Sequence, residues 1–257
     1  MDDILKSHQK DYSTTDLKRQ NDLYYTGLWG YEEYYIDKHF NPKLTTLELG
    51  TGGGRVVVAL ENHKHFHNIT AVDFVEKLIS INAAKGVAFK SKIKYGVANA
   101  IDLPFRDESF DQVICSGELI SHFPNRNYRI KVFEEAYRVL KSNGVLFANS
   151  LNIQQGRYVY IMRLITKIIR TFYNPRHYWP NDLPRLGARS GKLDWLCFRY
   201  NKSQLHYYYP AEMAYDLLSV GFAITEMNLS KQGREIKDPD FHFFRKQDIS
   251  IICKKIT

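Results

Sequence analysis

The chain has 257 residues, of which 44% are hydrophobic and 25% are charged, and its formal net charge is +8. This length and composition predict one globular domain with a sizeable core, and no repeat or low-complexity stretch interrupts it. The polar N-terminus lacks the pattern of a signal peptide and no apolar run reaches the length of a membrane span, so we expect a soluble, cytoplasmic protein. The three cysteines share no CxxC spacing, which argues against a disulfide framework and against a zinc site.

A glycine-rich turn is the first motif along the chain that carries chemistry. Residues 48–55 read E-L-G-T-G-G-G-R, behind an apolar run and ahead of the helix-like segment 56–60. Alternating glycines let a ligand approach the main chain, and the following helix offers free N–H groups, so the pattern predicts a nucleotide-type cofactor. A dinucleotide fingerprint requires glycine at its sixth position, where Arg55 stands, so the spacing argues against a nicotinamide cofactor.

An acidic residue ends the next apolar run. Residues 69–72 lead to Asp73, which lies 23 residues after Gly50. In a βαβ unit this is the end of the second strand, where a carboxylate can accept hydrogen bonds from both ribose hydroxyls. Asp73 is therefore the predicted ribose ligand, and it could also cap a helix predicted over residues 75–85. Phe74 beside it could line an adenine slot or pack in the core.

Three further stretches follow in order. Residues 97–105 read V-A-N-A-I-D-L-P-F, and residues 110–117 read F-D-Q-V-I-C-S-G, which predicts a fourth strand that ends near Ser116. A helix with apolar positions between residues 133 and 140 is predicted to end at Asn143-Gly144, ahead of an apolar strand. Outside these three stretches, residues 248–253 are predicted to form the last strand, antiparallel to the others.

Together with the glycine turn, these stretches resemble the class I S-adenosylmethionine-dependent methyltransferases of the type 11 kind, over residues 45–150. A weaker likeness continues at residues 209–212 and 221–222. The resemblance implies an α/β, Rossmann-like, doubly wound sheet of seven strands in the order 3-2-1-4-5-7-6, with a helical and loop cap inserted after strand five. It implies a methyl-transferring enzyme with S-adenosyl-L-methionine as cofactor. The residues that it places at the cofactor are Glu48, Gly50, Thr51, Gly52, Gly54, Asp73, Phe74, Asn99, Ala100 and Ser116, with Asn99 where the family usually has Asp.

Two segments make this chain individual within one domain, 1–257. Residues 1–40 are predicted to form an N-terminal helical segment over the cofactor side, as in related enzymes, where Tyr25 or Trp29 could close the site. Residues 153–205 hold ten basic and two acidic residues, so this predicted cap carries the whole net charge. Its first part predicts a helix with a basic stripe on an apolar surface, which could cover a pocket, lie against a membrane or face water.

Candidate substrate and catalytic residues come from the cap and from the end of strand four. Arginines along the cap's loop suit phosphate or carboxylate recognition, and Arg185, Arg189 and the nearby Tyr208 are the predicted substrate ligands. The predicted catalytic residue is His122, because family members often reach the acceptor from this place and a neutral imidazole can serve as a base. A structural histidine is the alternative. Weaker candidates are Glu118 and His206, and Cys115 is expected to be buried in its strand.

Missing motifs narrow the methyl acceptor. The end of strand four lacks the N/D-P-P-Y/F sequence of nucleic-acid amino methyltransferases, which argues against a base nitrogen. No Asp-Asn pair of the catechol type is present, so we expect no metal. An anionic small molecule is the favoured acceptor, and a structured RNA that binds the basic cap is the second hypothesis. A protein that binds the cofactor or a partner without turnover is the third.

Overall fold

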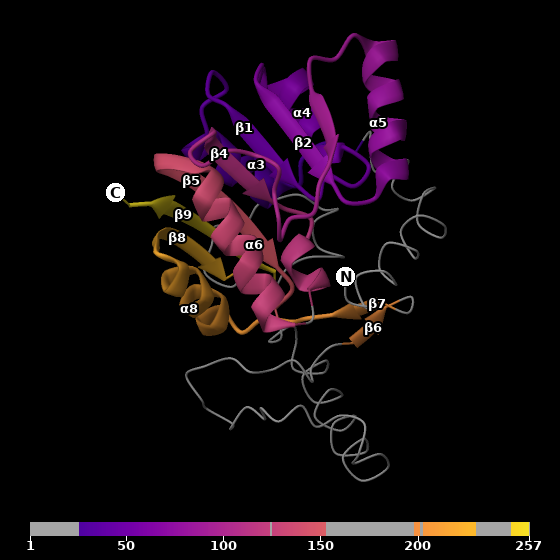
Figure 1. Cartoon of the computed structure of the whole chain (residues 1–257). Helices are drawn as coiled ribbons and strands as arrows, with labels where there is room; N and C mark the ends of the chain where they lie inside the picture. Colours follow the sequence, from indigo (N-terminus) through magenta and orange to yellow (C-terminus); the bar gives the residue numbers. More distant parts are fainter. Residues whose placement is uncertain (1–25, 124, 153–197, 201–202, 230–247, 257) are drawn as a thin grey trace.

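The fold is built on a seven-stranded sheet (Figure 1). The structure is a computed structural model that describes residues 26–123, 125–152, 198–200, 203–229 and 248–256. The strand order is β3-β2-β1-β4-β5-β9-β8, in which β1 to β5 pair in parallel and β9 is antiparallel to both of its neighbours. This confirms the predicted order 3-2-1-4-5-7-6. The strands are β1 (Thr46–Leu49), β2 (Ile69–Asp73), β3 (Lys94–Val97), β4 (Phe110–Cys115), β5 (Leu140–Ser150), β8 (Phe222–Leu229) and β9 (Ile249–Lys255).

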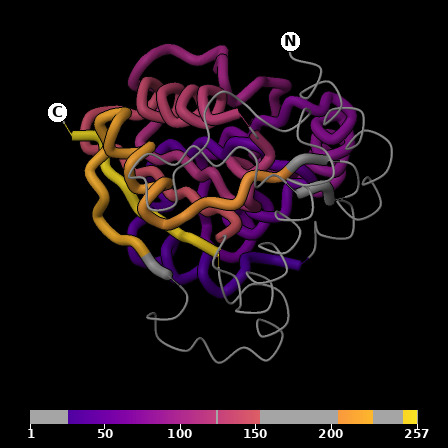
Figure 2. Tube along the Cα trace, turned by 90° about the horizontal axis from the view of Figure 1, so that it is seen from below, coloured from indigo at the N-terminus to yellow at the C-terminus, as the bar shows by residue number. Residues whose placement is uncertain are grey.

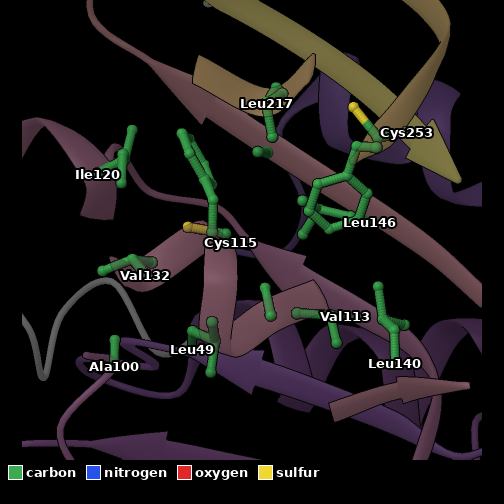
Figure 3. Close-up of a cluster of buried hydrophobic side chains, with 14 of the residues drawn as sticks. Leu49, Ala100, Val113, Cys115, Ile120, Val132, Leu140, Leu146, Leu217 and Cys253 are labelled. Atoms are coloured by element: carbon green, nitrogen blue, oxygen red, sulfur yellow. The ribbon is translucent and has the colours of Figure 1, made fainter. Parts of the chain in front are cut away.

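Helices cover both faces of this sheet, as the two-residue period of its strands requires. Alternate strand residues such as Leu47 and Leu49 face a core shared with α6 and α8, while Ile114 and Phe147 face a second core shared with α3 and α4. Figure 3 shows part of the first core, with Leu217 of α8 near the sheet residue Leu146. The helices are α3 (Gly30–His39), α4 (Arg55–Lys64), α5 (Glu76–Phe89), α6 (Arg126–Val139), α8 (Pro210–Val220) and the 3-10 helix η1 (Leu119–His122).

The last strand of the chain is inserted between two earlier strands of the sheet. β9, the yellow segment in Figure 2, lies between β5 and β8. A separate two-stranded sheet, β6 (Phe198–Tyr200) and β7 (Ser203–Leu205), stands apart from the main sheet, and β7 contacts η1. Most of the predicted cap, residues 153–197, lies outside the described residues. Within the described part of the chain, no helix combines the length and apolar character needed to cross a bilayer.

Two predicted boundaries differ from the structure. The helix expected to end at Asn143-Gly144 ends at Val139, because Leu140 already pairs with Phe110 as the first residue of β5. Asn143 adopts a left-handed conformation, with φ of 62°, inside that strand. The helix expected over residues 75–85 runs on to Phe89. The apolar pattern thus located both elements and missed how far the ladder and the helix extend.

Candidate cofactor site

A small pocket lies where β1 and β2 end and η1 begins. Gly50 directly follows β1, Asp73 ends β2, and Asn99 comes two residues after β3. Parallel strands present their carboxyl ends at one edge of the sheet, which explains why positions so far apart in the sequence meet here. The residues that line the pocket are Gly50, Val72, Asp73, Phe74, Ala98, Asn99, Ala100, Leu119 and Phe123. Five predicted cofactor residues therefore share one wall, whereas Leu119 and Phe123 were not anticipated.

The glycine turn has the backbone that its sequence demands. Gly50, Gly52 and Gly54 have φ of 67°, 52° and 83°, a region that other residues adopt only with strain. A Cβ on Gly50 would lie 2.6 Å from Cδ1 of Leu119, so the missing side chain lets η1 approach the turn. Asn82, on α5, fixes the turn from behind by donating from Nδ2 to the Gly52 carbonyl at 2.8 Å.

Three amides of the glycine turn itself, before the start of α4, are already hydrogen-bonded within the protein. The Thr51 N–H donates to the Val72 carbonyl at 3.0 Å, and the Gly54 N–H donates to the Thr51 carbonyl at 2.9 Å. The Gly52 N–H donates to Oδ2 of Asp73 at 2.8 Å. Because these three amides already have partners inside the protein, they are not free to donate to a ligand. The turn contributes the main chain of Gly50 to the pocket wall.

Asp73 is held between the turn and the start of α5. Its Oδ1 accepts from the Val75 N–H at 2.9 Å, so it supports the entry to the helix, although Val75 is the cap residue. Burial raises the pKa of Asp73, and its backbone hydrogen bonds to Val75 and Gly52 oppose that rise. The carboxylate has more lone pairs than the backbone N–H groups of Val75, Gly52 and Phe74 occupy, so it can still accept from a ligand hydroxyl.

Glu48 lies beneath the turn and is almost fully buried. Thr51 donates to its Oε2 through Oγ1 at 2.5 Å. Burial raises the pKa of Glu48 to about 7, while the Thr51 hydrogen bond and the charge of Arg55 pull in the opposite direction. Neither Glu48 nor Thr51 lines the pocket. Their mutual hydrogen bond instead joins the end of β1 to the glycine turn.

Arg55, which excluded a dinucleotide fingerprint, pairs with the N-terminal helix α3. Its guanidinium donates to both carboxylate oxygens of Glu32, at 2.6 and 2.7 Å, and lies 3.5 Å from the ring centre of Trp29. Ser116, at the end of β4, donates its hydroxyl to the same carboxylate. The predicted cofactor residue Ser116 is thus turned toward α3. No local pattern in the sequence links Glu32 with residues 23 and 84 positions away.

Asn99 stands at the pocket in a tight local turn. Its Oδ1 accepts from the Ile101 N–H at 3.2 Å, and its carbonyl accepts from the Asp102 N–H at 3.0 Å. The side chain is half-buried, and the buried Ala100 follows it on the same wall. The amide oxygen of Asn99 can still accept a hydrogen bond from an amino group, as the carboxylate of the family's usual Asp would.

The catalytic and substrate candidates fall in different places. His122 is half-buried at the end of η1, next to the pocket residue Phe123. Tyr208, expected to touch substrate, is instead fully buried, and its hydroxyl lies 3.0 Å from Nε of Arg129 and 3.3 Å from Oδ2 of Asp216. Its place in a buried charged network explains the difference. The predicted ligands Arg185 and Arg189 lie outside the described residues.

Of the two weaker candidates and the cysteine, His206 and Cys115 are buried and Glu118 is half-buried. His206 is buried with Nε2 2.9 Å from Oε1 of Glu212, and burial raises the pKa of Glu212 to about 7. The Glu118 N–H donates to Oδ1 of Asn149 at 3.0 Å. Cys115 is buried in β4, and burial raises the pKa of its thiol to about 12, so it stays protonated near neutral pH.

A larger pocket, of about 540 Å³, lies against β2 and β3 and shares the lining residues Val72 and Ala98 with the smaller one. Its lining includes Lys94, Tyr95, Phe105 and Phe110, and none of the predicted site residues. Size alone would place the ligand there, but the glycine turn and Asp73 do not reach it. The smaller pocket, which is lined by Gly50 and Asp73, is therefore the candidate cofactor site.

Comparison with known proteins agrees with this geometry. Residues 47–148 match the family model of a methyltransferase domain. A ubiquinone/menaquinone biosynthesis C-methyltransferase of Rickettsia prowazekii is 33% identical over 176 residues, which cover 65% of this chain and 64% of that protein. A demethylmenaquinone methyltransferase of Leptospira interrogans is 30% identical over 125 residues, covering 48% of this chain and 47% of that protein. The chain therefore matches less than two thirds of either curated relative.

A solved structure shows the same fold at greater sequence distance. A S-adenosylmethionine-dependent methyltransferase from Methanosarcina mazei superposes with a TM-score of 0.61 at 18% identity, over 90% of this chain and 99% of that one. The fold and the glycine turn thus define a Rossmann-like, class I methyltransferase architecture. Residues 47–148, which contain every predicted cofactor residue, match the methyltransferase domain model, and the chain is similar to S-adenosylmethionine-dependent methyltransferases. This similarity implies S-adenosylmethionine as the ligand.

Proposed function

We propose that this protein transfers a methyl group from S-adenosylmethionine to an anionic small-molecule acceptor. The observation that carries the proposal is the pocket that unites Gly50, Asp73 and Asn99 at the ends of three strands. The methyltransferase domain match over the same residues supports it.

The residues of the pocket fit the nucleoside part of this cofactor. Asp73 would accept from a ribose hydroxyl, because its carboxylate has more lone pairs than the backbone N–H groups of Gly52, Phe74 and Val75 occupy. Phe74, Leu119 and Phe123 would offer apolar surface to the purine ring, and Asn99 would face its polar edge. Gly50 keeps the turn free of a side chain, and a Cβ there would collide with Leu119.

Methyl transfer requires correct positioning of the acceptor more than acid or base catalysis. When bound, S-adenosylmethionine would supply an electrophilic methyl group, which the acceptor takes in line while the neutral thioether sulfur leaves with the electron pair of the C–S bond. The chain's own residues then have to hold the acceptor in line and exclude bulk water. We propose His122 as the base for an acceptor that must lose a proton, because it follows the pocket wall on η1 and its imidazole can accept a proton near neutral pH.

Two observations bear on the acceptor. The relatives from Rickettsia prowazekii and Leptospira interrogans are named for methylation in quinone biosynthesis, which supports a small molecule. The net positive charge of residues 153–205 supports an acceptor with negative charge, and it also favours the second candidate, a structured RNA. A methyl-transfer screen should therefore include carboxylated and phosphorylated phenols and amines in one arm and transfer RNA in the other. Product in the RNA arm alone would contradict our choice.

Calorimetric titration with S-adenosylmethionine tests the proposal directly. We expect one site per chain and competition by S-adenosylhomocysteine, because both ligands carry the adenosine that we propose for this pocket. Absence of measurable binding would remove the enzyme hypothesis. Binding without turnover across both arms of the screen would favour the third hypothesis, a fold that holds the cofactor for another purpose.

A further inference from the structure

One buried carboxylate joins the N-terminal helix to both sides of the cofactor pocket. Glu32 of α3 is 0% exposed, and it receives four hydrogen bonds. Its Oε2 accepts from Nη1 of Arg55 at 2.6 Å and from the Trp29 N–H at 2.8 Å. Its Oε1 accepts from Nη2 of Arg55 at 2.7 Å and from the Ser116 hydroxyl. Both oxygens are thus fully used within the protein.

The donors come from the two loops that flank the pocket. Arg55 is the first residue of α4 and directly follows Gly54, the last glycine of the turn. Ser116 directly follows β4 and stands three residues before Leu119, whose side chain covers Gly50. The side chain of Glu32, which belongs to a third element, therefore bonds both to the residue after the glycine turn and to the loop before η1. Buried, charge-assisted and two-pronged bonds of this kind fix geometry strongly.

A second tie from the same helix reaches the same loop. The Tyr31 hydroxyl accepts from Nδ2 of Asn149 at 2.9 Å, and Oδ1 of Asn149 accepts from the Glu118 N–H at 3.0 Å. Gly117 and Glu118 both have left-handed backbones, with φ of 66° and 64°. A loop with two such residues in succession relies on outside contacts to keep its shape. Helix α3 contacts one end of the loop directly, through Ser116, and the other end indirectly, through Asn149 of β5.

We propose that Glu32 is a positioning residue of the cofactor site, which acts through Arg55 and Ser116 to set the distance between the glycine turn and η1. The inference rests on the proposed function, because it assumes that the pocket binds S-adenosylmethionine. It assigns α3 an active part in cofactor affinity, beyond its packing against the sheet.

The test compares Glu32→Gln with Glu33→Gln. Glu33 is the next residue on the same helix, with its side chain 54% exposed and paired with Lys64. We expect Glu32→Gln to raise the Kd for S-adenosylmethionine about tenfold, which equals ~1.4 kcal/mol, and Glu33→Gln to leave it unchanged. Titrations are run at a temperature where circular dichroism shows each variant to be folded. A purely structural role would lower the unfolding midpoint and leave the Kd of the folded protein unaltered, and that result would overturn the inference.

A double-mutant cycle identifies the route. If Glu32 acts through Arg55, the Glu32→Gln/Arg55→Met variant should bind no more weakly than the worse single variant, whereas additive losses would contradict the coupling. Trp29 gives an independent signal, because its ring lies over the Arg55 guanidinium. In a Trp179→Phe/Trp195→Phe background it is the sole tryptophan, and Glu32→Gln should shift its emission.

The outcomes separate this inference from the function on which it rests. If the unsubstituted protein binds no S-adenosylmethionine, the proposed function fails and the inference fails with it. If that protein binds and Glu32→Gln binds equally well, the function stands and the inference fails alone. Should Glu32→Gln not fold, Arg55→Lys keeps the charge but loses the two-pronged pairing, and the same tenfold loss, about 1.4 kcal/mol, is expected from it.

Discussion

Gly50 must meet two demands at once, a left-handed backbone and an absent side chain. Its φ is 67°, and a Cβ there would lie 2.6 Å from Leu119. We expect Gly50→Ala to cost about 1–3 kcal/mol of folding stability through strain and contact, and to abolish binding of S-adenosylmethionine. Denaturant unfolding and calorimetric titration of the same variant would measure the two effects.

Gly221, which ends α8 and does not line the pocket, provides a matched control for the strain at Gly50. Its φ is 109°, and an added Cβ would lie no closer than 3.4 Å to Tyr137, which is an ordinary contact. Gly221→Ala should therefore show the backbone cost while cofactor binding survives. A second variant, Gly50→Ala/Leu119→Ala, removes the collision and should recover part of the lost stability. Equal behaviour of Gly221→Ala and Gly50→Ala would show that the contact with Leu119 is unimportant.

Glu48 should make folding stability depend on pH in a predictable direction. Burial raises its pKa from the usual 4.5 to about 7, so the folded state holds a proton that the unfolded state has released between these values. Its contribution is therefore fully present below pH 4.5 and is lost as the pH rises toward 7. The stability of the unsubstituted protein relative to Glu48→Gln should fall over this window by on the order of 2–3 kcal/mol.

The measurement is the free energy of unfolding at several pH values for both proteins. The difference between them matters, because Glu212 also has a raised pKa and contributes a slope of the same sign. Glu33→Gln, at an exposed position, should leave the profile unchanged. A constant difference between pH 4.5 and pH 7 would mean that Glu48 is not buried as the structure has it.

At the scale of elements, a buried charged network joins α6 to α8. Arg129 of α6 is fully buried and donates to the Phe123 carbonyl at 3.0 Å, to Tyr208 at 3.0 Å and to Glu212 at 3.4 Å. Glu212 caps α8 by accepting from the Tyr209 N–H at 3.3 Å. The same arginine thus supports the pocket residue Phe123 and the start of the next helix.

Removing this arginine should destabilise the protein strongly. Arg129→Met leaves Glu212 buried without its cation, which typically costs about 3–5 kcal/mol. Lys131→Met, two residues along the same helix and exposed, should change the free energy of unfolding by less than ~0.5 kcal/mol. In the double variant Arg129→Met/Glu212→Gln the combined loss should be smaller than the sum of the two single losses. Denaturant titrations that give strictly additive losses would argue against direct coupling.

Elements were predictable where one segment carries its own pattern. The apolar run and glycines around Gly50 located β1, the turn and α4, and the run to Asp73 located β2. Glu32, Asn82 and Leu119 were not predictable, because each acts across the fold on a residue distant in the sequence. These residue types are equally common in ordinary helices, so helix propensity does not predict their long-range contacts.

At the scale of the molecule, charge and cofactor chemistry lie in different parts of the chain. Every predicted cofactor residue falls between residues 48 and 116, and the part of the chain outside residues 153–205 has no net charge. A site for the cofactor thus needs no basic surroundings, while the basic segment suits a separate anionic ligand. Substitutions in the two parts should therefore separate cofactor binding from use of the acceptor.

Charge reversal in the basic segment tests this separation. We expect Arg185→Glu/Arg189→Glu to keep the Kd for S-adenosylmethionine within about twofold but to lower turnover of carboxylated or phosphorylated acceptors at least tenfold, because repulsion replaces guanidinium recognition. Release of S-adenosylhomocysteine measures turnover. Lys90→Glu/Lys92→Glu changes the net charge by the same amount at exposed positions before β3, and it should leave turnover intact. Equal loss in both variants would assign the effect to net charge, and loss of cofactor binding in the arginine variant would place the basic segment at the cofactor instead of the acceptor.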